Sequence, residues 1–176
     1  MKVWLPVTIL VLWAGSGLVA PWLALDPNTI HLDRILATPL LAGGFGYDDL
    51  GRPLLDRLVA GATTSFLVAL WVVGLSALMG TLIGSFAAFA GGLWDRLLVH
   101  VIDLFLAFPG ILLAIALAGI LGPGIENVVI ALTIVGWVGY ARLARAQVLS
   151  LKTRDHVQAA IALGVPQARI VRAHLL

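Results

Sequence analysis

The stretch that decides the fold reads TTSFLVALWVVGLSALMGTLIGSFAAFA, residues Thr63–Ala90, and it contains no charged side chain. A membrane-spanning helix needs roughly 20 mostly apolar residues, and this stretch exceeds that length. At about 1.5 Å per residue, such a helix is longer than a ~30 Å hydrocarbon core, so it must tilt or project from the membrane. The stretch therefore predicts an integral membrane protein.

The overall composition supports the same class of protein. Of the 176 residues, 61% are apolar and 11% are charged, whereas a soluble domain averages roughly 45–50% apolar and about 25% charged residues. The mean hydropathy is +1.05. The formal net charge of +2 is what basic cytoplasmic loops produce in a membrane protein, so we expect the lipid bilayer and not nucleic acid as a partner.

Several chemical functions are not expected from this sequence. It contains no cysteine, and its four histidines lie far apart, so neither a disulfide nor a metal site is predicted. No phosphate-binding glycine-rich loop followed by Lys and Ser or Thr is found, and no nucleophile lies beside a base in any arrangement that we can propose. We therefore expect no catalytic residue and no cofactor.

Three further stretches are long and apolar enough to span a membrane: Val3–Leu25, Leu97–Leu121 and Ile125–Ala141. The first resembles a signal peptide because Lys2 precedes it, but its apolar run exceeds the ~7–15 residues typical of a signal core, so we interpret it as an uncleaved span. Gly122-Pro123-Gly124 is typical of a tight turn between the last two spans. The prediction is an all-α membrane protein with four transmembrane helices.

The distribution of basic residues predicts the orientation of these spans. Six Lys or Arg residues and one Asp follow the fourth span, whereas three Arg and five Asp lie between the first and second spans. By the positive-inside rule, the N-terminus and the tail are cytoplasmic. The predicted regions are a first transmembrane helix (1–25), an external loop (26–62), a transmembrane core (63–154) and a cytoplasmic tail (155–176).

The external loop contains the sequence DDLGRPLLDRLVAGA, residues Asp48–Ala62. Its apolar residues recur at helical spacing, and Pro53 suits the first turn of a helix. We expect a short amphipathic helix along the outer face of the membrane. Two interpretations stay open, namely a docking surface for an external partner and a plain interfacial linker.

Two residues of the predicted third span differ from their apolar surroundings. Asp103 is an acid well inside the span, where a carboxylate is costly and needs a partner or a cavity. His100 and Arg96 lie three and seven residues earlier, on roughly the same helix face. A structural pair is one interpretation, and a pathway or gating residue is the other. Pro109 is expected to kink the span.

Small residues recur in the second span. Gly80 and Gly84 are four residues apart, a spacing that permits close contact between membrane helices. The contact could form within the bundle or against a second subunit.

The tail, DHVQAAIALGVPQARIVRAHLL (Asp155–Leu176), predicts a helix, a sharp turn and a second helix. The residues before Gly164 are good helix formers, Gly164 suits a left-handed cap, and Pro166 suits the first turn of the next helix. Ala159 and Ala160 give the first helix a small, smooth face. From the pattern alone, this hairpin could dock a partner protein or could pack on its own bundle.

The tail resembles the EAA loop of permease subunits of binding-protein-dependent ABC importers. The matching residues are Gln158, Ala159, Ala160, Gly164, Ile170 and Leu176. The external stretch FGYDDLGRPLLDRLVAGATTSFLVAL is similar to the corresponding stretch of the dipeptide, oligopeptide and nickel subgroup, as is the region from LAFPG (Leu106) onward. The resemblance runs from about Asp26 to Leu176, and its strongest part combines the EAA loop with Asp49–Arg52.

This resemblance implies a role for the tail and a set of partners. Gln158, Ala159, Ala160, Gly164 and Ile170 would contact a cytoplasmic ATPase and transmit its closure to the spans. The expected partners are a second permease subunit, two ATPase subunits and an external substrate-binding protein, in a bacterial inner membrane. The transported solute would be a peptide or a related small solute, with nickel as a further possibility.

The chain departs from the family pattern in two places. Gln158 stands where the family has Glu, which removes the charge but keeps the capacity for hydrogen bonds. The family continues past the position of Leu176 with two more spans, so the chain is expected to correspond to the N-terminal part of a six-span permease. The alternative to a permease is a non-transporting membrane scaffold or an inactive permease fragment.

Overall fold

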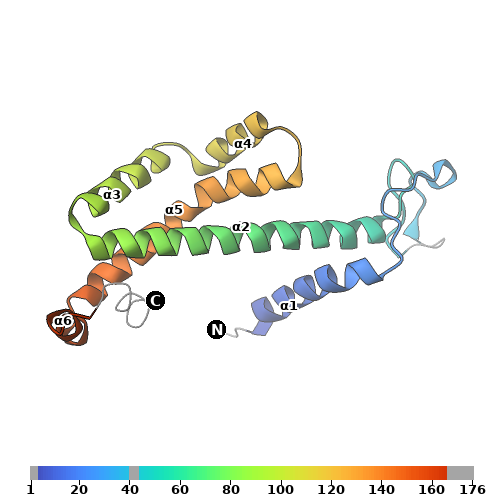
Figure 1. The fold of residues 1–176 in the computed structure, drawn as a ribbon. Coiled ribbons are helices and arrows are strands. Elements are labelled where there is room, and N and C mark those ends of the chain that lie inside the picture. Colours follow the sequence, from blue (N-terminus) through green and yellow to red (C-terminus); the bar gives the residue numbers. More distant parts are fainter. Residues whose placement is uncertain (1–3, 40–43, 166–176) are drawn as a thin grey trace. The chain divides into compact units, whose positions relative to one another are not determined.

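The computed structural model describes residues 4–39 and 44–165, and their regular structure is helical (Figure 1). Apart from one isolated bridge between Tyr47 and Pro53, these residues contain no strand pairing, so the predicted all-α class is confirmed. The elements are α1 (Trp4–Val19), the 3-10 turns η1 (Ala20–Trp22) and η2 (Leu32–Arg34), α2 (Leu54–Ala90), α3 (Gly92–Leu106), α4 (Gly110–Leu121), α5 (Ile125–Lys152) and α6 (Asp155–Ala162).

The chain divides into two compact units, Met1–Leu70 and Trp71–Leu176. Two helices, α2 and α5, are long and apolar enough to cross a bilayer, and a third crossing results if the bent pair α3 and α4 forms one span. Helix α1 has 16 residues, or roughly 24 Å at 1.5 Å per residue, and it passes into the 3-10 turn η1 before the predicted end at Leu25. The predicted count of four spans is therefore not confirmed.

The amphipathic helix expected within the external loop is not a separate element. Helix α2 begins at Leu54, directly after Pro53, and continues without interruption to Ala90. The sequence changes in polarity near Thr63, but the weak helix formers there, such as Gly61 and Thr63, each cost only about 1 kcal/mol or less and do not end a helix. The expectation of a separate helix was wrong because a change in polarity is not a change in backbone conformation.

In the first unit, α1 packs against the N-terminal part of α2 through aromatic side chains. The rings of Trp13 and Phe66 meet edge to face with centroids 5.6 Å apart, and Trp13 Nε1 donates a hydrogen bond to the carbonyl of Ala62 at 3.2 Å. Gly17 is buried, and a Cβ atom there would lie 3.2 Å from the Phe66 ring. A larger residue at this position would therefore press on the Phe66 ring.

The predicted kink at Pro109 is confirmed, and it is a complete break. Helix α3 ends at Leu106, α4 begins at Gly110, and their axes differ by 85°. Pro109 has an extended ψ of 115°, and a proline also disfavours the helical conformation of the residue before it. The backbone therefore leaves the helix at this proline and starts a new one after it.

The turn predicted at Gly122-Pro123-Gly124 is also confirmed. Both glycines have positive φ, 86° and 144°, which few other residues adopt without strain. The Asn127 side chain donates hydrogen bonds to the carbonyls of Leu121 and Gly122 at 2.9 and 3.2 Å. These bonds satisfy carbonyl groups that the end of α4 leaves without a helical partner.

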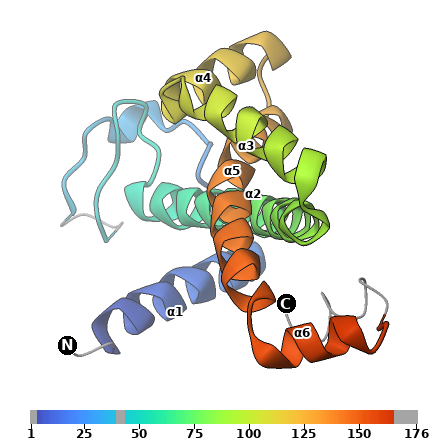
Figure 2. The same cartoon turned by 90° about the vertical axis from the view of Figure 1, so that its left-hand side faces the viewer.

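In the second unit, α5 crosses the C-terminal half of α2 at very close range (Figures 1 and 2). A Cβ atom at Gly80 would lie 2.7 Å from Tyr140 Cβ, and one at Gly84 would lie 2.9 Å from Ala141 Cα. One turn before Gly80, Ser76 faces Gly136 of α5, where a Cβ atom would lie 2.7 Å from the Ser76 hydroxyl oxygen. The close contact predicted for Gly80 and Gly84 is thus confirmed as a contact within the chain.

This crossing predicts opposite effects for the same substitution at two glycines of α2. Gly84→Ala should destabilise the fold by about 1–3 kcal/mol, because the added methyl group overlaps the α5 backbone. Gly74→Ala should be neutral or stabilising by up to about 1 kcal/mol, since a Cβ atom at Gly74 meets nothing within 4 Å and alanine favours the helix. The measurement is thermal unfolding of the detergent-solubilised chain, and equal effects would contradict the crossing.

Candidate coupling site and its supports

The tail helix α6 is held on the bundle by a small hydrophobic cluster. Val157 of α6 is fully buried, and it packs with Ala88 and Phe89 at the end of α2 and with Val148 of α5. Leu151 and Val165 contact the same cluster. Because burial of one Val side chain contributes roughly 1.5–3 kcal/mol, this cluster fixes the side of α6 that faces the bundle.

Lys152 provides a second connection between the same elements. Its Nζ donates a hydrogen bond to the carbonyl of Phe89 at 2.8 Å and lies 5.3 Å from the centroid of the Phe89 ring. The carbonyls in the last turn of a helix lack partners, and a cation is favourable at that end. Gly91 follows with φ of 68°. The end of α2 is thus capped by the end of α5.

An ion pair joins the start of α3 to α5. Arg145 Nε and Nη2 donate to the two carboxylate oxygens of Asp95 at 2.6 and 2.8 Å. Both side chains are partly buried. This two-bond geometry between guanidinium and carboxylate is stronger and more directional than a single contact. Sequence analysis missed the pair, because its members are 50 residues apart and no local spacing connects them.

The other side of α6 is open. Gln158, Ala159 and Leu163 are exposed, and the exposed fraction of Leu163 is 82%. Gly164 follows with φ of +73°, the left-handed conformation that the sequence predicted for a helix cap. Figure 2 shows α6 turning away from the end of α5. Ala160 also lies in α6, whereas Ile170 and the predicted helix from Pro166 to Leu176 lie outside the described residues.

Gln158 has a bonding role that the family's glutamate could not fill in the same way. Its Nε2 donates a hydrogen bond to the carbonyl of Lys152 at 2.7 Å. An amide can donate there, whereas an ionised carboxylate can only accept. The side chain thereby satisfies a carbonyl at the C-terminal end of α5.

The structural pair predicted for Asp103 does not form. Asp103, His100 and Arg96 are all exposed, and none of them makes an ion pair within the part of the chain that the structure describes. His100 Nδ1 instead bonds the carbonyl of Arg96 at 2.6 Å. Of the two interpretations of Asp103, a pair within the described residues is therefore not observed, and the charged residue of α3 that pairs is Asp95.

In the other unit, the Asp49–Arg52 stretch forms a turn around the neighbouring carboxylate of Asp48. The backbone N–H groups of Leu50 and Arg52 donate to Asp48 Oδ1 at 2.9 and 2.8 Å, and Arg52 Nε donates to Oδ2 at 2.8 Å. Arg57 donates to the same oxygen. Burial alone would raise the pKa of Asp48, but the hydrogen bonds from Arg52 and Leu50 outweigh it and lower the pKa from 3.8 to about 2.

The fold and these connections define a helical membrane protein whose last described helix, α6, exposes part of its surface. Residues 80–176 match the family described as binding-protein-dependent transport system inner membrane component. The match covers more than half of the chain, and the chain belongs to this family. The family is one of transport components.

Three relatives illustrate the similarity. The chain is 37% identical to the probable D,D-dipeptide transport system permease protein DdpC of Escherichia coli (strain K12), over 96% of the chain and 57% of the relative. It is 41% identical to the di/tripeptide permease DppC of Pseudomonas aeruginosa, over 88% and 54%, and 38% identical to the glutathione permease GsiD of Escherichia coli O6:K15:H31, over 90% and 52%. The chain thus spans about half the length of these relatives.

The turn around Asp48 leads to a prediction about the external loop. Asp48→Asn should speed hydrogen exchange at the amides of Leu50 and Arg52 at least severalfold, because it removes the charge that these groups bind. Asp49→Asn is the matched control, since the Asp49 side chain is 80% exposed, and it should change little. Equal exchange rates in the two variants would contradict the role of Asp48.

The same turn should depend on pH with a definite sign. The pKa of Asp48 in the fold is about 2, below its ordinary value of 3.8. Ionised Asp48 therefore adds stability that is fully present above pH 3.8 and is lost as the pH falls from 3.8 through 2. Protection of the Leu50 amide, relative to that of the Asp48→Asn variant at the same pH, should disappear over this interval. Protection that persisted at pH 1 would contradict the assignment.

The Asp95–Arg145 pair predicts that lysine cannot replace arginine. Arg145→Lys should cost about 1.5–3 kcal/mol in thermal unfolding, because one ammonium group cannot make both hydrogen bonds. Arg142→Lys is the control, since Arg142 is exposed and has no ion pair among the described residues. If both variants unfold at the same temperature, the pair does not hold α3 on α5.

Proposed function

We propose that this chain is part of the membrane-spanning permease of an ATP-driven importer, and that the segment beginning at α6 docks on a cytoplasmic ATPase. The observation that carries the proposal is the position of α6. One side of the helix is buried through Val157 against α2 and α5, while Gln158, Ala159 and Leu163 on other sides are exposed. A partner that pushes on α6 would thus act directly on two membrane helices.

The exposed surface has the chemistry of a docking site. Leu163 is a large apolar side chain that is almost fully exposed beside the Gly164 turn, and α6 lies beyond the end of the apolar helix α5. An exposed apolar side chain outside the membrane lowers the free energy when a partner protein covers it. Ala159 has a small side chain that allows close approach. These features support the role proposed for Gln158, Ala159, Ala160, Gly164 and Ile170.

The proposed assembly follows from the family. Binding-protein-dependent transport implies an external substrate-binding protein, and the proposed complex also contains a second permease subunit and two ATPase subunits. The basic residues at the end of α5 and after it support a cytoplasmic position for α6 and, with four crossings, for the N-terminus. The external loop would then face the substrate-binding protein.

We propose a peptide as the transported solute. The relatives described above carry the names of dipeptide, tripeptide and glutathione transporters. The nickel alternative has no such support in the names of these relatives. The proposal is therefore restricted to small peptides.

The docking role predicts that a charge at the tip of α6 separates the chain from the ATPase. Leu163→Asp should lower co-purification of the ATPase at least tenfold, because docking would bury an unpaired carboxylate. Leu163→Met keeps the apolar contact and should retain binding. The measurement is recovery of the ATPase with the affinity-tagged chain from detergent-solubilised membranes.

A second control separates local docking from a general effect of charge. Gln147→Asp adds a carboxylate at an exposed position of α5 and should leave co-purification unchanged. Full ATPase recovery with Leu163→Asp would reject the proposed docking surface and favour the alternative of a membrane scaffold. Loss of the ATPase with Gln147→Asp as well would mean that α6 is not the specific contact.

A further inference from the structure

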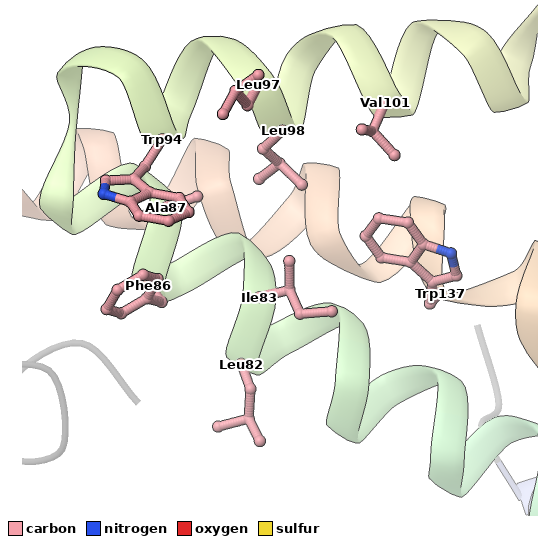
Figure 3. Close-up of a pocket in the computed structure, with 9 residues that line it drawn as sticks. All are labelled: Leu82, Ile83, Phe86, Ala87, Trp94, Leu97, Leu98, Val101 and Trp137. Carbon is pink, nitrogen blue, oxygen red and sulfur yellow. The ribbon is translucent and has the colours of Figure 1, made fainter.

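Helix α3 has two chemically different faces. One face lines an apolar groove of about 490 Å³ together with α2 and α5 (Figure 3). The residues that α3 contributes recur at helical spacing, and they are Trp94, Leu97, Leu98 and Val101. Leu98 and Ile102 are buried against the bundle. Leu98 and Ile102 therefore pack α3 on the rest of its unit, while Trp94, Leu97 and Val101 are apolar side chains that stay exposed along the groove.

The opposite face carries a stripe of ionisable side chains, Arg96, His100 and Asp103. At 100° per residue these positions lie within about 60° of one another, and all three are exposed. The hydrogen bond from His100 Nδ1 to the carbonyl of Arg96 leaves Nε2 available. None of the three side chains forms an ion pair with another residue in the described part of the chain.

The exposure of these three side chains indicates their surroundings, because α3 belongs to a membrane protein. Ionisable side chains within membrane spans almost always face a bundle interior or a water-filled cavity, because their transfer into lipid is costly. If α3 and α4 form one span that begins at Gly92, Asp103 lies roughly 17 Å along it at 1.5 Å per residue, about half of a ~30 Å core. The stripe cannot face lipid at that depth without a large penalty.

The break after α3 points to a pathway. The helix ends one turn after Asp103, and the next helix starts at an angle of 85°. Discontinuous helices in transporters commonly provide binding groups near the middle of the membrane, and the C-terminal end of a half-helix favours cations. The stripe also has one member per turn from the expected cytoplasmic connector to Asp103, so water could follow it continuously from that end.

We propose that Arg96, His100 and Asp103 line the water-filled cytoplasmic half of the transport pathway, and that Asp103 attracts cationic groups of the ammonium class there. The proposal rests on the proposed function, because a peptide carries an ammonium group at its N-terminus. It assigns Asp103 a role in the pathway and assigns the opposite face of α3 to packing.

The natural absence of cysteine allows a direct test with single cysteines in membranes that contain the full chain and its partner subunits. His100→Cys should react readily with two small water-soluble thiol reagents of opposite charge, a trimethylammonium-ethyl and a sulfonato-ethyl methanethiosulfonate. Val101→Cys is the matched control at the same depth, because Val101 lines the apolar groove. It should react at least tenfold more slowly.

The charge of Asp103 is tested in the His100→Cys background. The ratio of cationic to anionic reaction rates should fall roughly tenfold with Asp103→Asn, because one negative charge nearby is removed, and it should be retained with Asp103→Glu. Arg96 is present in all of these variants, so its own field cancels in the comparison.

Each other outcome overturns a stated part of the proposal. No reaction at His100→Cys would mean that the stripe is covered by a protein surface such as a second permease subunit. A ratio that does not respond to Asp103→Asn would reject the cation site. Co-purification of the ATPase with the same variants is a separate readout, so failure of the pathway assignment is distinguishable from failure of the docking surface.

Discussion

The close crossing of α2 and α5 is the constraint on which the rest of the second unit depends. Gly80 and Gly84 let the backbone of α5 approach α2 at Tyr140 and Ala141 to distances at which no side chain fits. Without a hydrophobic driving force between helices in lipid, such small-residue contacts and their dispersion energy are a main source of association. The glycines therefore set both the distance and the position of the crossing.

The position of the crossing determines what meets at the C-terminal end of α2. Ala88 and Phe89 come next to Val148, and the α5 residue Lys152 reaches the last carbonyls of α2. The same geometry brings Arg145 to Asp95 at the start of α3. The seat of α6 is thus a consequence of the crossing, since Val157 packs on the two helix ends that the crossing brings together.

These successive contacts give a physical basis for the proposed coupling between α6 and the membrane helices. If the proposed docking on α6 occurs, a force on α6 would reach α2 and α5 through a buried cluster and a capped helix end, and α3 through the two-bond ion pair. Helix α3 ends at Leu106 and α4 begins at Gly110 at an angle of 85°, so no continuous helix crosses the break at Pro109. The elements nearest to the proposed pathway are therefore connected to the proposed docking helix by short, well-packed contacts.

Much of the fold could be predicted from local sequence signals, and the failures have physical causes. The apolar lengths of α2 and α5, the turn at Gly122-Pro123-Gly124 and the break at Pro109 follow from the local chemistry of apolar, glycine and proline residues. The contact of Gly80 and Gly84 was predicted, but its partner α5 was not, because glycine spacing does not specify what approaches.

The helix and the turn of the candidate site could be predicted from the sequence, but the contacts that hold them on the bundle could not. The α6 helix and the left-handed Gly164 follow from local propensity. The Asp95–Arg145 pair and the seat of Val157 join residues far apart in sequence, so no local pattern contains them. Pairing was one of two interpretations of Asp103, and the sequence could not decide between them, because helical spacing shows which residues share a face and not whether that face is turned toward the bundle.

The most direct test of the account is a photo-crosslinking amino acid at Ala159, in the full chain within its native membranes. Ala159 is exposed on α6 and is small, so the probe replaces no buried contact. We predict a crosslinked product with the cytoplasmic ATPase subunit. Crosslinks confined to the chain itself, or to a protein outside the membrane, would contradict the claim that α6 is the surface through which the membrane helices meet the ATPase.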